Sequence, residues 1–266
     1  MRILNGFIAS LCVIIGAFLS GDVNKNSILL ASVVFICVIA GNIVNDYFDF
    51  GIDSVNKPSK FKRWEKFGRR NLLSLSLFLF LIANVISLFS GIFYFFITLT
   101  ATVLLIVYTP FFKPFLFLGN IFVSGISGFT FILGSITSGN IKPSIFPFLF
   151  AFFLHLPREI LKDIEDIEGD RKFSLKTLPI VIGESKSFII SFILILLLFF
   201  ITILSLFFYN IYFKLLMIFI FDIPLIYFVA KSFTMEEMNK RASYLEKRLK
   251  FLMVSGLIVI ITGGMR

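Results

Sequence analysis

The stretch ILLASVVFICVIAGNIVNDYFDFGID, residues 28–53, combines the two features that decide the fold class and the chemistry of this chain. Its first part, from Ile28 to Asn45, carries no charged residue and approaches the roughly 20 residues that a helix needs to span a bilayer. Its last part holds the three acids Asp46, Asp49 and Asp53. The stretch therefore predicts a membrane-spanning helix with an acidic end.

Apolar runs of similar length recur along the 266 residues, of which 58% are hydrophobic against roughly 45–50% in soluble domains. They lie near residues 3–20, 28–50, 71–90, 92–108, 115–138, 144–161, 186–208, 211–230 and 250–264. These runs predict an all-α integral membrane protein with nine transmembrane helices. Only Ser90 and Gly91 separate the third run from the fourth, so an arrangement of eight helices stays open.

The 25 basic residues give the chain a net charge of +9, and they are distributed unevenly between the runs. With nine helices and a cytoplasmic N-terminus, nearly all of them fall in cytoplasmic segments, the exceptions being Lys25, Lys142, Lys214 and Arg266. Cytoplasmic loops are enriched in Lys and Arg, so this topology explains the charge without a nucleic-acid partner. It predicts a multi-pass protein of the cell membrane with its acidic clusters on the cytoplasmic side.

A second acidic cluster repeats the spacing of the first. Positions four, three and four apart hold Asn42, Asp46, Asp49 and Asp53 in the first cluster, and Glu159, Asp163, Asp166 and Asp170 in the second. At about 100° per residue, each set shares one face of a helix. The repetition suggests a single transmembrane domain, residues 1–266, with two related halves of about 1–138 and 139–266. The intervening apolar sequence is too degenerate to prove a duplication.

Both clusters place carboxylates where they need cations, because the C-terminal end of a helix is already negative. Mg²⁺ prefers oxygen ligands and commonly joins carboxylates to substrate phosphates. The clusters therefore predict Mg²⁺ sites that hold a diphosphate, with the ligands Asp46, Asp49, Asp53, Asp163, Asp166 and Asp170. The charge of a departing diphosphate also needs to be offset, and the nearest basic residues for this are Arg158, Lys162 and Lys113.

The two clusters resemble the signatures of the UbiA superfamily of intramembrane prenyltransferases. Residues 45–53 match its first motif, NDxxDxxxD, and residues 163–170 match its second, DxxDxxxD. Further matches are Asn56-Lys57-Pro58, Tyr108 with Lys113, Gly119-Asn120 and Thr177-Leu178-Pro179. The segment 59–68 departs from the superfamily's usual pattern.

The resemblance implies a ring of nine helices around a central cavity that opens laterally to lipid, with a cytoplasmic cap. It implies that Asn42, Asn45 and the aspartates of the first motif form one half of a Mg²⁺–diphosphate site, and that Asp163, Asp166 and Asp170 form the other. Tyr108, Lys113, Asn120, Arg158 and Lys162 are then expected at the donor site. Loss of diphosphate from an isoprenyl diphosphate donor would leave an allylic cation, which a lipid-soluble acceptor attacks.

Within the superfamily, NDYFDFGIDSVNKP (residues 45–58) and the short chain are most similar to the archaeal branch that makes digeranylgeranylglyceryl phosphate for ether lipids. That branch transfers a geranylgeranyl group from geranylgeranyl diphosphate to the glycerol hydroxyl of geranylgeranylglyceryl phosphate. For the acceptor phosphate, Lys60, Arg63 and Arg69 offer cations. The base that takes the hydroxyl proton stays open between an aspartate and the leaving diphosphate.

Other functions are weighed against this one. An aromatic acceptor of the 4-hydroxybenzoate or naphthoate type needs no phosphate pocket, and haem or chlorophyll-type acceptors are a third class. An ion-coupled transporter also carries acids in its membrane helices, but usually near the bilayer midplane rather than at helix ends. His155, the only histidine, is interpreted as structural, and the role of Asp222 stays open.

Overall fold

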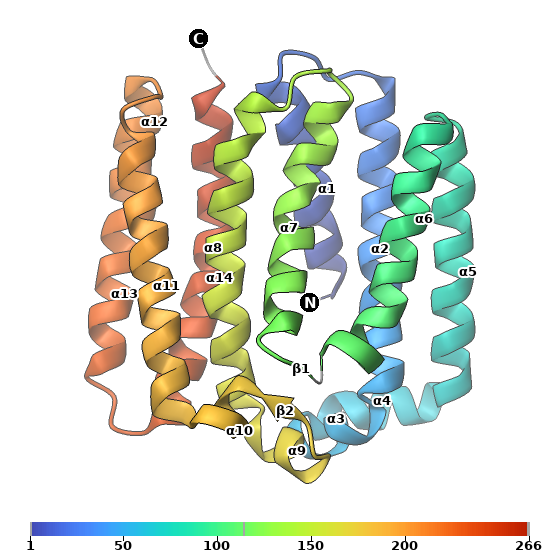
Figure 1. Cartoon of the computed structure of the whole chain (residues 1–266), viewed down its shortest axis with the longest axis vertical. Helices are drawn as coiled ribbons and strands as arrows, with labels where there is room; N and C mark the ends of the chain where they lie inside the picture. Colours follow the sequence, from blue (N-terminus) through green and yellow to red (C-terminus); the bar gives the residue numbers. More distant parts are fainter. Residues whose placement is uncertain (1, 114, 265–266) are drawn as a thin grey trace.

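The computed structural model describes residues 2–113 and 115–264, and nearly all of them are helical (Figure 1). Two short strands within this part, β1 (Phe115–Leu116) and β2 (Lys176–Thr177), pair in parallel. The long helices stand side by side, and short helices gather at one end of the bundle. The helical architecture predicted from the sequence is confirmed.

Seven helical segments of the described chain are long and apolar enough to cross a membrane. They are α2 (Lys25–Phe48), α5 (Arg69–Leu88), α6 (Ile92–Val107) with the π-helical turn Tyr108–Phe112, α7 (Leu118–Ile136), α8 (Ile145–Glu165) with the short turn before it, α11 (Glu184–Ser205), and α12 (Ile211–Leu216) continued into α13 (Ile223–Phe233). The shorter apolar helix α1 (Arg2–Leu19) precedes them, and α14 (Met238–Gly263) follows with charges in its first half. The chain is thus a multi-pass membrane protein.

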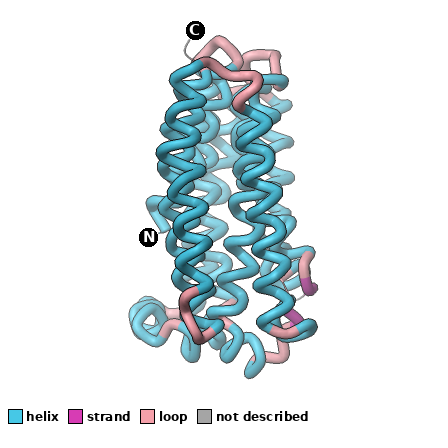
Figure 2. Tube along the Cα trace, turned by 90° about the vertical axis from the view of Figure 1, so that its left-hand side faces the viewer, coloured by secondary structure: helices cyan, strands magenta, loops and turns pink. Residues whose placement is uncertain are grey.

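One end of the bundle carries a layer of short elements (Figures 1 and 2). This end layer consists of α3 (Phe50–Asn56), α4 (Pro58–Phe67), α9 (Ile167–Lys172) and α10 (Leu178–Ile182), together with β1 and β2. Within it α3 packs on α9, which brings the segments after α2 and α8 together. The segments that hold Lys25, Lys142 and Lys214 lie at the opposite end, as the charge pattern predicts, whereas Arg266 lies outside the described residues.

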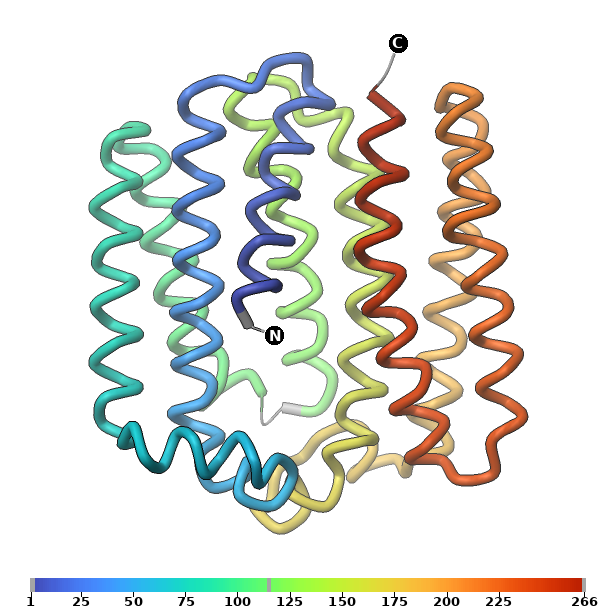
Figure 3. Tube along the Cα trace, turned by 180° about the vertical axis from the view of Figure 1, so that it is seen from behind, coloured from blue at the N-terminus to red at the C-terminus, as the bar shows by residue number. Residues whose placement is uncertain are grey.

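The helices are arranged around α8, which packs against α7, α11 and α14. Figure 3 shows α1 between α2 and α14, and α1 also packs closely on α7. An extended apolar core joins α8, α11, α13 and α14 and includes Leu154, Leu198, Leu225 and Leu249. This core fixes the position of α14 beside α8, so α1, α2, α7, α8 and α14 surround a common interior.

Two glycines allow α1 and α7 to approach each other closely. A Cβ atom on Gly16 would lie 2.0 Å from the carbonyl oxygen of Phe131, and one on Gly134 would lie 1.9 Å from that of Val13. The hydroxyl of Ser135 donates to the carbonyl oxygen of Gly16 at 2.9 Å across the same contact. Small residues of this kind bring membrane helices into backbone contact, which here holds one wall of the interior in place.

Candidate active site

Each acidic motif bends at its second aspartate. Helix α2 ends before Asp49, which has φ −80° and ψ 7°, and α8 ends before Asp166, which has φ −91° and ψ 7°. The single helix face predicted for each motif holds only as far as that aspartate, since Asp53 lies on α3 and Asp170 on α9. The two motifs therefore bend at corresponding residues in nearly the same backbone conformation, and each turns its last aspartate into the end layer.

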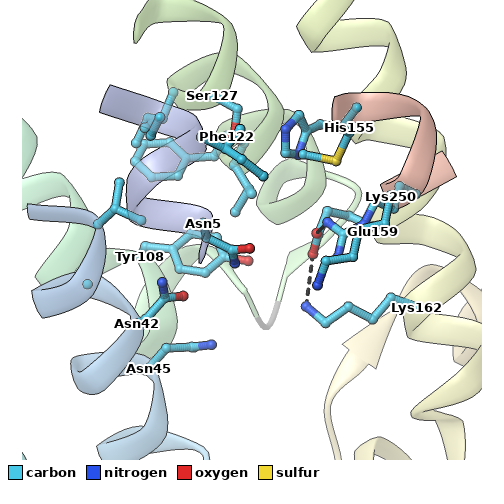
Figure 4. A pocket seen from close by; sticks show the side chains of 18 of the residues that line it. Asn5, Asn42, Asn45, Tyr108, Phe122, Ser127, His155, Glu159, Lys162 and Lys250 are labelled. Carbon is cyan, nitrogen blue, oxygen red and sulfur yellow. Dashed lines mark hydrogen bonds and ion pairs between the residues drawn. The ribbon is translucent and has the colours of Figure 1, made fainter. Parts of the chain in front are cut away.

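Both motifs face one cavity of about 370 Å³. The sequence-predicted site residues that line it are Asn42, Asn45, Asp49, Asp53, Lys60, Tyr108, Lys113, Arg158, Lys162, Asp163, Asp166 and Asp170. Figure 4 shows Asn42, Asn45 and Tyr108 on one wall and Lys162 on the wall opposite. Farther from the end layer the lining is mostly apolar and includes Ile8, Leu105, Phe131 and Leu257, with the polar side chains of Ser127 and His155 among them. The cavity is therefore acidic at one end and hydrophobic along its depth.

Lysines bind the motif carboxylates from neighbouring elements. Lys60 Nζ of α4 lies 2.5 Å from Asp46 Oδ1 and also pairs with Asp53. Lys113 Nζ lies 2.6 Å from Asp49 Oδ2. Carboxylates and ammonium groups thus pair at the polar end of the cavity. A bound anion would attract the lysines there, and its metal ions would attract the carboxylates.

A set of contacts made by Asn56 and Lys57 links the first motif to the second. Asn56 Nδ2 donates to the carbonyl oxygen of Asp166 at 2.9 Å, and Asn56 Oδ1 accepts from the backbone N–H of Gly169 at 2.9 Å. Gly169 has no room for a side chain, because a Cβ atom there would lie 2.4 Å from the Asn56 amide. Lys57 Nζ pairs with Asp166 Oδ2 at 2.6 Å. These contacts, the inter-motif clamp, fix the second motif against the first.

A charged network joins α8 to α14 on the opposite wall. Arg158 lies between two acids, with Nη1 2.8 Å from Glu159 Oε1 and Nη2 2.7 Å from Glu246 Oε1. Lys162 Nζ lies 3.0 Å from Glu159 Oε2, the contact drawn in Figure 4. Lys250 of α14 lies on the same wall (Figure 4). This wall is therefore built from two helices that are far apart in the sequence.

Hydrogen bonds from neighbouring elements orient two of the predicted polar groups. Asn120 does not line the cavity, but its Nδ2 donates to Asp163 Oδ2 at 2.9 Å. Thr109 Oγ1 donates to Asn45 Oδ1 at 2.9 Å. The ring of Tyr108 stacks on Phe122 with 5.5 Å between centroids. Asn120 is thus placed to position a carboxylate rather than to touch a substrate.

Besides Asn120, three predicted residues lie away from the cavity lining. Asp46 is 1% exposed and lies beneath Lys60. Arg63 and Arg69 are exposed on α4 and at the start of α5, and the Arg69 guanidinium lies 4.7 Å from the centre of the Tyr47 ring. The structure brings Lys60 to the acidic end of the cavity, but it does not bring these two arginines there.

Some residues at the site are not apparent from sequence reasoning. Glu246 and Lys250 belong to a charged stretch typical of a solvated face, and their role depends on the packing of α14 against α8. Asn56 was visible as part of a family match, but its bridging contacts were not. His155 lines the cavity, although it is interpreted from the sequence as structural. Asp222 Oδ1 accepts from Thr202 Oγ1 of α11 at 2.8 Å, well away from the motifs.

Burial changes the acidity of the last aspartate of the second motif. It raises the pKa of the Asp170 carboxyl to about 6, because the charged form loses water. Lys113 opposes this shift, and the carboxylates of Asp166 and Asp49 add to it. A cation at this position would restore the charged form of Asp170.

Comparison with known proteins agrees with this geometry. Residues 9–254 match the model of the UbiA prenyltransferase family. The chain belongs to the UbiA prenyltransferase family. A digeranylgeranylglyceryl phosphate synthase of Methanosphaera stadtmanae is 31% identical over 269 residues, which cover 100% of this chain and 96% of the relative. The family assignment thus covers both motifs and the elements that carry them.

Solved structures share the fold of this family member. A structure described as giving insights into digeranylgeranylglyceryl phosphate synthase in membranes is 31% identical, has a TM-score of 0.75 and covers 99% of this chain and 95% of its own. A UbiA homologue from Archaeoglobus fulgidus, bound to GPP and Mg²⁺, is 16% identical with a TM-score of 0.68, covering 98% of this chain and 99% of its own. The second likeness supports the fold alone.

The oxygen donors of the cavity fit magnesium. Among the described residues, no three acidic, histidine or cysteine side chains converge closely enough to hold a metal by themselves. The donors instead stand in two groups, with Asp49 and Asp53 in the first motif and Asp163, Asp166 and Asp170 in the second. Mg²⁺ often takes one or two carboxylates and completes its shell with water and substrate phosphates. The arrangement therefore suits ions that each motif holds in part and a diphosphate completes.

Proposed function

We propose that the chain catalyses the Mg²⁺-dependent transfer of a geranylgeranyl group from geranylgeranyl diphosphate to the glycerol hydroxyl of geranylgeranylglyceryl phosphate. The product would be digeranylgeranylglyceryl phosphate. The observation that carries this proposal is the cavity itself, which has two acidic motifs at one end and an apolar lining along its depth. The name of the full-length relative supports the choice of acceptor.

In this proposal the donor diphosphate lies at the acidic end, between the two motifs. Bound Mg²⁺ would neutralise the diphosphate and stabilise it as a leaving group. The ligands would be Asp49 and Asp53 on one side, and Asp163, Asp166 and Asp170 on the other. Asp46 pairs with Lys60 and would not be a ligand in this arrangement. Lys113 and Lys162 line the same end and would offset the charge that develops on the leaving oxygen. Asn42 and Asn45 would donate hydrogen bonds to the diphosphate.

The isoprenoid chain of the donor would occupy the apolar depth of the cavity. Phe122, Phe131 and Phe150 line this region from α7 and α8. Burial of the chain removes apolar surface from water, and the lining keeps water from the allylic cation. Aromatic faces near the reacting carbon attract positive charge. Tyr108, stacked on Phe122, extends this aromatic surface to the polar end.

We further propose that α1 and α14 join the seven apolar segments to make nine transmembrane helices in a ring open laterally to lipid. The end layer would then be a cytoplasmic cap over the active site. The basic segments beside the end layer support this orientation, because positive charge is retained on the cytoplasmic side. The chain would act as one domain, with membrane lipids as its surroundings and no nucleic acid among its partners.

A product assay tests the proposal. Purified protein in detergent is supplied with Mg²⁺, geranylgeranyl diphosphate and either geranylgeranylglyceryl phosphate or 4-hydroxybenzoate, and the products are identified by mass spectrometry. We expect digeranylgeranylglyceryl phosphate and no prenylated benzoate. Transfer to the aromatic acid alone would keep the donor chemistry and refute the proposed acceptor.

A further inference from the structure

The cavity has a side compartment whose lining is mostly cationic. This compartment, about 300 Å³ in volume, shares Lys57, Arg158, Lys162, Asp166 and Lys250 with the main cavity. Its complete lining is Lys57, Arg158, Lys162, Glu165, Asp166, Glu246, Lys247 and Lys250, which is five basic and three acidic side chains. The excess of positive charge beside the donor site would attract a second anion.

Lys250 differs from Lys57, Arg158 and Lys162 because no acid of the described chain forms an ion pair with it, whereas Lys247 donates to Ser243. Lys57 pairs with Asp166, Arg158 with Glu159 and Glu246, and Lys162 with Glu159. Within residues 2–113 and 115–264, Lys250 Nζ has no ion pair or hydrogen bond, although the side chain is half-buried. The charges of Arg158 and Lys162 act on it, and those of Glu246 and Glu159 oppose them. A half-buried ammonium group of this kind is stabilised when an anion binds.

The face of α14 beside Lys250 changes from charged to apolar in the direction of the cavity depth. Lys250, Met253 and Leu257 all line the main cavity and are three and four positions apart, so they share one face of the helix. Figure 4 shows Lys250 on the same wall as Lys162 and Glu159, across from Tyr108 and Asn42. The surface thus matches an amphiphile with an anionic head and an apolar chain.

We propose that Lys250, together with Arg158, binds the phosphate of the acceptor lipid beside Lys162, which faces the donor, and that Met253 and Leu257 contact its apolar chain. This inference rests on the proposed function, because it assigns a site to the phosphate of that acceptor. It moves the phosphate away from the residues expected from the sequence. Lys60 lines the main cavity but not the side compartment, and the two exposed arginines line neither.

The test compares two variants of α14 that lose the same charge. Lys250→Met keeps the length of the side chain, and we expect it to raise the KM for geranylgeranylglyceryl phosphate by roughly 10- to 100-fold, the range for a lost hydrogen bond to a charged group. The KM for geranylgeranyl diphosphate should stay within about twofold of the wild type. Lys240→Met is the matched control, because Lys240 is exposed, pairs with Glu237 and lines neither compartment.

A second readout uses geranylgeranylglycerol, which lacks the phosphate. The wild type and Lys250→Arg should prefer the phosphorylated acceptor, and Lys250→Met should lose most of that preference. An unchanged acceptor KM in Lys250→Met, or a rise in the donor KM instead, would overturn the assignment.

The outcomes distinguish this inference from the proposed function. A wild type that does not prenylate geranylgeranylglyceryl phosphate at all would refute the function itself. A wild type that uses the phosphorylated and unphosphorylated acceptors equally well would overturn the phosphate site, whether or not Lys250→Met folds.

Discussion

Replacement of Asn56 by alanine removes the two hydrogen bonds through which α3 holds α9. Both bonds are 2.9 Å long and join Asn56 to the backbone of the second motif, at Asp166 and Gly169. A hydrogen bond contributes about 1 kcal/mol net, so the loss of both is worth about 2 kcal/mol. This corresponds to a factor of about 30 in the population of correctly aligned motifs. We therefore expect kcat/KM for the donor to fall by about 10- to 100-fold.

The assay is the initial rate of transfer at varied Mg²⁺ concentration, with folding checked by size exclusion and thermal unfolding in detergent. The apparent affinity for Mg²⁺ should weaken together with kcat/KM, because the misaligned motifs share the ions less well. Asn71→Ala is the control, since Asn71 is exposed and donates only to the nearby carbonyl oxygen of Phe67 in the described structure. Its turnover should match the wild type.

A double-mutant cycle sharpens this prediction. Gly169→Ala alone should lose activity, because its Cβ atom would lie 2.4 Å from the Asn56 amide. Asn56→Ala removes that amide, so the double variant should be no worse than Asn56→Ala alone. Wild-type activity in Asn56→Ala, or strictly additive losses in the double variant, would refute the role of the inter-motif clamp.

Three further perturbations test other parts of the structure. Gly134→Ala places a Cβ atom 1.9 Å from the Val13 carbonyl oxygen. It should lower the free energy of unfolding by about 1–3 kcal/mol and lower the Tm in detergent. The control is Gly125→Ala, whose Cβ atom would have nothing within 4 Å and should leave the Tm unchanged. Because burial raises the pKa of Asp170 to about 6, protons should compete with Mg²⁺ as the pH falls through 6, with up to about tenfold weaker apparent affinity per pH unit. Asp170→Asn should remove this pH dependence. If the apparent affinity of the wild type for Mg²⁺ does not change between pH 7 and pH 5, the prediction is contradicted. Arg63→Ala should change both KM values by less than about twofold, and a selective rise in the acceptor KM would restore the phosphate site predicted from the sequence.

Much of the fold is predictable from the hydrophobic runs and from the polar residues and glycines that separate them. Ser90 and Gly91 correctly mark a break, since α5 ends at Leu88 and α6 begins at Ile92. The run at residues 28–50 corresponds closely to α2. The last run was predicted at residues 250–264, but α14 extends from Met238 to Gly263 as one helix. Amphipathic and apolar stretches join without a breaker there, and only tertiary packing reveals that both belong to a single element.

Part of the candidate site was predictable from the spacing of its residues in the sequence. Carboxylates at matched intervals identified both motifs, and the cavity lining brings most of them together. The bend at Asp49 and at Asp166 was not predictable, because no proline or glycine occupies either position. The network of Arg158 with Glu246 depends on two helices that are distant in sequence. Spacing along one helix carries no information on such contacts.

The most direct test of the central claim is the Mg²⁺-dependent turnover of geranylgeranyl diphosphate by Asp49→Asn and Asp163→Asn, each with its fold verified in detergent. These carboxylates come from different motifs and line the same cavity. If both motifs hold the metal–diphosphate complex, each variant should lose at least about 1,000-fold in kcat, since several kcal/mol of charge stabilisation depend on the ions. Wild-type turnover in either variant, or equal turnover of the wild type in EDTA, would contradict the account.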